Sequence, residues 1–141
     1  MAIFFHDENI QSGLKRKRAI KSWLKAVLLY EERKEGEINI VLTTDENLRE
    51  INSKYLSRDY YTDIITFDYS EGKRIQGDLF ISIERVNENS EKYNVSKENE
   101  LLRVMVHGLL HLMGYSDKKQ EDKAKMRMME EKYLALCHLN D

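Results

Sequence analysis

Residues 96–117 read SKENELLRVMVHGLLHLMGYSD, and this stretch decides the predicted fold. Apolar side chains fill most of it and leave no fully polar face, which is typical of a helix buried at the centre of a domain. Ser96 is a suitable N-cap residue, and Gly114 is suited to the left-handed turn that ends many helices. The stretch therefore predicts a central helix over 96–114.

The rest of the chain supplies strands and further helices around this centre. Apolar residues at helical or alternating spacing mark these elements, and Thr43 followed by Glu46 forms a capping box in front of one helix. Two β-rich runs separated by the short segment EGKR are expected to form a hairpin. The expected helices span 13–33, 46–56, 96–114 and 118–139, and the expected strands span 37–44, 63–70 and 75–86. This order predicts a single α/β domain over 1–141, in which a mixed sheet packs against helices.

Composition limits the classes of protein to consider. The chain has 141 residues, of which 41% are hydrophobic and 34% charged, so it can form one core and is not disordered as a whole. Its net charge of −2 gives no global attraction for nucleic acid, so RNA binding requires a local patch and DNA binding is not expected. The single cysteine excludes an intrachain disulfide. We expect no membrane span or signal peptide, and therefore a cytoplasmic protein.

His107 and His111 are four residues apart, which places both imidazoles on one face of a helix. Two histidines at this spacing, with no other signal, are often incidental. Two imidazoles without hydrogen-bond partners in an apolar helix, however, would destabilise the fold. Gly114 can turn the chain back, so that Asp117 returns as a third ligand in the pattern H-x-x-x-H-x-x-G-x-x-D. Zinc accepts such a ligand set. The sequence therefore predicts a metal site on the central helix and the turn that follows it.

Gly108 limits the chemistry of this site. In zinc peptidases with the pattern H-E-x-x-H, a glutamate at the corresponding position acts as the general base. Glycine cannot take that role, which argues against peptide cleavage by that mechanism. Hydrolysis by a metal-activated water stays open.

The segment 107–117, HGLLHLMGYSD, resembles the signature H-G-x-L-H-L-x-G-Y-D-H of the YbeY family of bacterial ribosomal RNA maturation endoribonucleases. Three further segments resemble family motifs in family order. They are INSKY (51–55) for L-N-x-x-Y/F, YTDIITF (61–67) for P-T-D-V-L-S-F, and GDLFIS (77–82) for G-D-I-x-I-S. These matches run from Ile51 to Asp117, about half of the chain.

The resemblance implies a metal-dependent, single-strand-specific RNA hydrolase on an α/β fold. It also implies a role in 3′-end maturation of small-subunit (16S) ribosomal RNA and in ribosome quality control, with single-stranded RNA and the ribosome as partners. One zinc ion (Zn²⁺) per chain would be held by the three signature side chains, here His107, His111 and Asp117.

Two positions depart from the family pattern. Asp117 stands where the family has a third histidine, and a carboxylate oxygen is an acceptable zinc ligand that gives the site one less positive charge. Leu56 stands where the family has an arginine after L-N-x-x-Y/F, and Arg58 follows two residues later as a candidate phosphate contact. No residue is identified as the general base, and Arg58 and Asp63 are the candidate catalytic residues.

Several other residues have both a structural and a functional interpretation. Thr62 and Asp63 suit either a turn or the site, and Asp78 suits a buried hydrogen bond better than catalysis. His138 is the rival to Asp117 as third ligand, whereas His6 is expected to be incidental. The basic segment KRKR (15–18), with Lys21 and Lys25, is a candidate RNA contact, and Met126, Met128 and Met129 are expected to pack.

Two functions compete with RNA cleavage. One is a zinc peptidase-like hydrolase, which the glycine at 108 disfavours. The other is a non-catalytic ribosome-assembly factor whose metal is structural.

Overall fold

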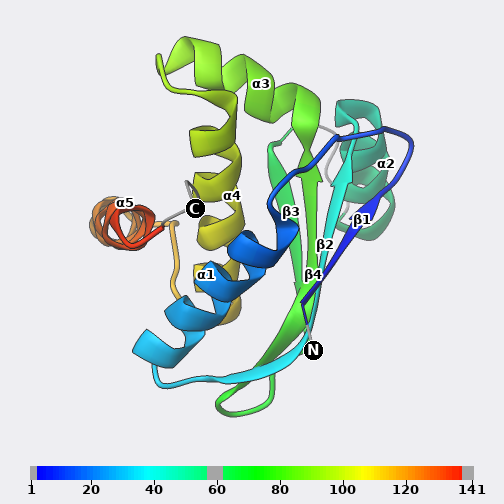
Figure 1. Ribbon diagram of the computed structural model, residues 1–141. Coiled ribbons are helices and arrows are strands. Elements are labelled where there is room, and N and C mark those ends of the chain that lie inside the picture. Colours follow the sequence, from blue (N-terminus) through cyan, green and yellow to red (C-terminus); the bar gives the residue numbers. More distant parts are fainter. Residues whose placement is uncertain (1–2, 57–61, 138–141) are drawn as a thin grey trace.

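The computed structural model describes residues 3–56 and 62–137, which form one α/β domain (Figure 1). Within them, the elements in chain order are β1 (Ile3–Asp7), α1 (Lys17–Tyr30), β2 (Lys34–Thr43), α2 (Asp45–Leu56), β3 (Ile64–Asp68), β4 (Arg74–Ser82), α3 (Ile83–Lys92), α4 (Lys97–Leu112) and α5 (Gln120–Ala135). None of the helices in these residues is long and apolar enough to cross a membrane.

The four strands form a mixed sheet in the order β1-β2-β4-β3. β1 and β4 pair in parallel with β2, whereas β3 pairs antiparallel with β4. The predicted mixed sheet and the predicted β3–β4 hairpin are therefore confirmed. β1 was not predicted, and it forms because Ile3 and Phe5 pair with Ile38 and Ile40 of β2, far along the chain.

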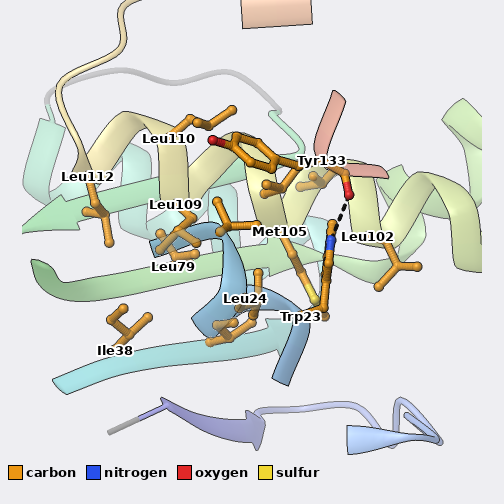
Figure 2. Close-up of a cluster of buried hydrophobic side chains, with 14 of the residues drawn as sticks. Trp23, Leu24, Ile38, Leu79, Leu102, Met105, Leu109, Leu110, Leu112 and Tyr133 are labelled. Atoms are coloured by element: carbon orange, nitrogen blue, oxygen red, sulfur yellow. Dashed lines mark hydrogen bonds between the residues drawn. The ribbon is translucent and has the colours of Figure 1, made fainter. Parts of the chain in front are cut away.

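The helices lie on both sides of the sheet (Figure 1). α1 and α4 cover one face and α5 packs outside α4, whereas α2 lies against the other face. Figure 2 shows the core that the sheet forms with α1 and α4. At the edge of this core, the indole N–H of Trp23 in α1 donates to the carbonyl of Tyr133 in α5 at 2.7 Å. Met105, Leu109 and Leu110 of α4 are fully or almost fully buried there, so the prediction of a central helix is confirmed.

Both predicted ends of α4 are present. The Ser96 side chain accepts a hydrogen bond from the Asn99 N–H at 3.0 Å, which caps the start of the helix. Gly114 has φ 97°, and the Tyr115 N–H donates to the Leu110 carbonyl while the Gly114 N–H donates to the His111 carbonyl. These two bonds form a Schellman motif, which turns the chain sharply after the helix.

Several predicted boundaries were wrong. The first helix begins at Lys17 and not at 13, because Arg16 adopts a left-handed conformation with φ 59°. The strand predicted to reach 86 ends at Ser82, whose hydroxyl caps the unpredicted helix α3. The cap of α2 is Thr44 and not Thr43, since the Thr44 hydroxyl accepts from the Asn47 N–H at 3.1 Å. The last helix spans Gln120–Ala135 and not 118–139.

α5 carries the methionine-rich stretch of the sequence. Met126 and Met129 pack in the core as predicted, whereas Met128 is 59% exposed, so packing was the wrong expectation for that residue.

Candidate metal centre

The side chains of His107, His111 and Asp117 converge as the sequence predicts. The two histidine Nε2 atoms lie 3.1 Å apart, and Asp117 Oδ2 lies 3.5 Å from His107 Nε2 and 3.4 Å from His111 Nε2. Tetrahedral zinc with bonds of about 2.1 Å holds its ligand atoms about 3.4 Å apart. The three atoms therefore form a triangle of the size that one metal ion needs, and the group can hold such an ion.

The surroundings of the two histidine rings suit metal binding. Glu130 Oε2 lies 2.5 Å from His107 Nδ1, so the ring donates its Nδ1 proton to Glu130 and presents Nε2 to the other two ligands. Burial, followed by the nearby His107, lowers the pKa of His111. The lowered pKa of His111 favours the neutral imidazole that binds a metal.

The turn that carries Asp117 is fastened to the connection between α1 and β2. The Tyr115 hydroxyl donates to Glu31 at 2.7 Å, and the Arg33 guanidinium donates to the Met113 carbonyl at 3.0 Å. Burial and the Glu31 carboxylate raise the pKa of Tyr115 to about 12, so its hydroxyl remains a donor at neutral pH. These contacts hold the turn in place although the Asp117 side chain itself is partly exposed.

Sequence reasoning missed a buried charge network behind His107. Glu130 accepts a hydrogen bond from Arg103 Nη1 at 3.0 Å, and Arg103 also makes a bidentate contact with Glu100 at 2.9 and 2.7 Å. Glu100 and Glu130 are 1% and 4% exposed. Burial by itself would raise the pKa of Glu130, but the His107 hydrogen bond and the Arg103 charge together lower it. Glu130 is therefore an ionised acceptor that orients the His107 ring.

A signal for this network was present in the sequence. Glu130 falls at helical spacing among three residues of α5 that are buried, namely Met126, Met129 and Tyr133. A carboxylate on a buried helix face requires a partner. On α4, Arg103 precedes His107 by one turn and so lies on the same side of the helix.

Gly108 faces the sheet and not the predicted ligands. A Cβ atom there would lie 2.7 Å from Ile64 Cδ1 and 3.1 Å from Leu79 Cδ1. Glycine thus lets α4 approach β3 and β4 closely, which gives this position a packing role.

Asp63 lies beside the same network, with its carboxylate 3.9 Å from Arg103 Nη2. Burial raises the pKa of Asp63, and the charges of Arg103 and His107 only partly oppose this effect. The Thr62 hydroxyl instead donates to the Ile64 carbonyl at 3.3 Å, a local turn contact. Arg58 and His138 lie outside the described residues.

Asp78 and His6 lie on the face of the sheet that points away from α4. Strand residues alternate between the two faces, and Leu79, next to Asp78, faces α4. Asn39 joins them: its amide donates to Asp78 at 3.2 Å, and its oxygen lies 2.9 Å from His6 Nε2. Asp78 therefore has the hydrogen-bonding role that was expected, although it is only half-buried.

The basic segment 15–18 is remote from the histidine pair. Arg16 lies 3.5 Å from Glu98 in the first turn of α4, and Lys25 lies 3.7 Å from Glu35. A rise of 1.5 Å per residue puts Glu98 roughly 20 Å along the helix from His111. The segment therefore does not border the metal centre.

Comparison with known proteins agrees with this arrangement. The sequence pattern of the family "Endoribonuclease YbeY" matches residues 3–138. Proteins named Endoribonuclease YbeY from Flavobacterium johnsoniae and Bacteroides fragilis are 48% and 47% identical over 127 and 136 residues, which cover 90% and 96% of this chain and 91% and 98% of theirs. The solution structure of TM1509 from Thermotoga maritima superposes with a TM-score of 0.65 at 26% identity, covering 94% of this chain and 86% of that one. The chain therefore belongs to the YbeY endoribonuclease family.

Proposed function

We propose that this protein is a metal-dependent endoribonuclease that cleaves single-stranded RNA at one zinc ion held by His107, His111 and Asp117. The observation that carries the proposal is the triangle of ligand atoms, with sides of 3.1, 3.4 and 3.5 Å, in a member of this family. Two imidazole nitrogens and one carboxylate oxygen leave a fourth tetrahedral position open to water or to RNA.

A zinc ion bound there would supply a water of lowered pKa and would neutralise charge that develops at the phosphorus. The protein residues fix this site: Glu130 holds the ring of His107, and the turn after α4 presents Asp117. Because Asp117 is an anion, the loaded site has one positive charge less than a site of three histidines.

Asp63 and Arg58 are the proposed residues for proton transfer and phosphate contact. Asp63 is supported by its raised pKa, which brings a carboxylate closer to the range useful for proton transfer, and by its place beside Arg103. Arg58 is supported by sequence alone, as the arginine nearest to the position that the family motif assigns.

The family resemblance extends the proposal to the biological role. The substrate would be the 3′ end of the 16S ribosomal RNA precursor, and the protein would also act in ribosome quality control, in the cytoplasm. The ribosome would then be its partner, and residues 1–141 would act as a single catalytic domain.

The test compares zinc-loaded protein on single-stranded RNA, double-stranded RNA, single-stranded DNA and a denatured protein substrate. Single-stranded RNA alone should be cut, and a chelator should stop the reaction. His107→Ala protein, purified in parallel, controls for contaminating ribonucleases. Cleavage of the protein substrate without cleavage of RNA would reverse the proposal in favour of a peptidase.

A further inference from the structure

A pocket of about 450 Å³ lies between the α3–α4 connection, α4 and α5, on the side of the charge network behind His107. Its floor includes Glu100, Arg103 and Glu130, the network that holds His107. One carboxylate and one imidazole ring therefore separate the pocket from the predicted ligand atoms. An RNA strand that crosses the metal centre would therefore reach this pocket within a few nucleotides.

The rim of the pocket is rigidly built where α3 passes into α4. Asn94 has φ 57°, the Val95 N–H donates to the Ser90 carbonyl at 2.9 Å, and the Asn94 N–H donates to the Glu91 carbonyl at 3.2 Å. This is a second Schellman motif, and it fixes the backbone of the preceding residue, Tyr93. The cap at the start of α4 fixes the backbone of Asn99 in the same way.

The floor and the rim differ in how their polar groups are satisfied. On the floor, Arg103 binds both glutamates. At the rim, the side chains of Asn99, Arg127 and Glu131 form no hydrogen bond or ion pair with another described residue. Tyr93 is 51% exposed there. The rim thus offers an aromatic ring, an amide, a cation and a carboxylate to a ligand.

We propose that this pocket binds one unpaired nucleobase of the RNA strand, a few nucleotides away from the bond that is cut. The inference rests on the proposed function. Tyr93 stacks on the base, Asn99 and Glu131 bind its edge, and Arg127 contacts the adjoining phosphate. Aromatic stacking and edge hydrogen bonds are how proteins recognise unpaired RNA bases.

The charges of the pocket favour a base over a bare phosphate. The floor has one positive and two negative side chains, a net charge of −1, which disfavours an anion inside. The Glu131 carboxylate accepts hydrogen bonds, so it favours bases with an exocyclic amino group, namely cytosine, adenine and guanine, over uracil, which has none. The pocket therefore predicts that a base with an exocyclic amino group is preferred over uracil at this position of the strand.

The test measures the affinity of zinc-loaded protein for short cytosine, adenine and uracil ribo-oligomers by fluorescence anisotropy at low temperature, with the recovered oligomers checked for cleavage. The parent should bind the cytosine or adenine oligomer more tightly than the uracil oligomer. Tyr93→Ala should weaken the preferred complex roughly 5- to 150-fold, and Tyr93→Phe should not. Glu131→Gln should reduce the preference among bases. Arg127→Ala should weaken the complexes with all oligomers, and the slope of log affinity against log salt concentration should fall by about 1.

Tyr69→Ala is the matched control, since Tyr69 is also exposed but lies in the β3–β4 connection. Zinc content should stay at the parent value in Tyr93→Ala, while the KM for RNA rises. The proposed base pocket is wrong if Tyr93→Ala and Tyr69→Ala bind the preferred oligomer with equal affinity, or if the parent binds none of the oligomers. A parent that binds RNA through Tyr93 but does not cut it would instead overturn the proposed function, so the two failures are distinguishable.

Discussion

Glu130→Gln should lower the affinity of the protein for zinc without unfolding it. The substitution keeps the size of a side chain that is 4% exposed, but it removes the charged acceptor 2.5 Å from His107 Nδ1. Arg103 keeps its bidentate contact with Glu100, so no buried charge is left unpaired. Removal of such a partner of a metal-binding histidine costs about 10- to 100-fold in metal affinity, or about 1.4 to 2.7 kcal/mol.

The assay is competition for zinc with a chromophoric chelator, with the free energy of unfolding of the metal-free protein measured by urea titration. Glu131→Gln is the matched control, since the neighbouring carboxylate makes no contact with His107, and it should bind zinc as the parent does. If Glu130→Gln binds zinc as tightly as Glu131→Gln, Glu130 does not orient His107 and the interpretation of the network is wrong.

Further predictions concern the third ligand, the glycine between the histidines and the candidate proton acceptor. Asp117→Ala should weaken zinc binding in the chelator assay, and Asp117→His should restore it and shift the pH dependence of cleavage to lower pH, because the site gains one positive charge. His138→Ala should leave zinc affinity unchanged. If instead it loses the metal while Asp117→Ala retains it, the ligand set is wrong. Gly108→Ala should lower the free energy of unfolding by about 1–3 kcal/mol in urea titration, because its Cβ would lie 2.7 Å from Ile64. Asp63→Asn should slow cleavage but raise the urea midpoint at neutral pH. Burial raises the pKa of Asp63 in the folded state, so the ionised carboxylate destabilises the folded protein at any pH above the ordinary aspartate pKa. The stability that Asp63→Asn gains should therefore vanish as the pH falls below the ordinary aspartate pKa. A lower midpoint at neutral pH would contradict this reasoning.

The elements that local sequence specifies were the ones predicted correctly. α4 has its cap, its apolar periodicity and its terminating glycine within one continuous stretch, so its identity and both ends followed from that stretch alone. β1 has five residues and becomes a strand through its pairing with β2, which no local pattern encodes. α3 buries only Val86 and Ser90 among its described side chains, so its apolar pattern is too weak to separate it from the preceding strand.

In the candidate site, too, the residues close together in the sequence were predicted, and the contact between distant segments was not. His107, His111 and Asp117 follow one another along a helix and a turn, so helical spacing and one glycine were enough to bring them together. The contact between Glu130 and His107 joins two helices and spans 23 residues of sequence, so it depends on how α5 crosses α4. Tertiary packing of this kind cannot be obtained from periodicity, although a carboxylate in register with buried side chains marks the position.

The central claim is that one zinc ion at this site cleaves RNA, and a zinc titration of metal-stripped protein tests it most directly. Cleavage of single-stranded RNA should be absent before zinc is added, rise in proportion to added zinc and level off at about one zinc per chain. The double variant His107→Ala with His111→Ala should neither bind the ion nor gain activity. Undiminished cleavage by the stripped protein, or the same titration curve for the double variant, would contradict the account.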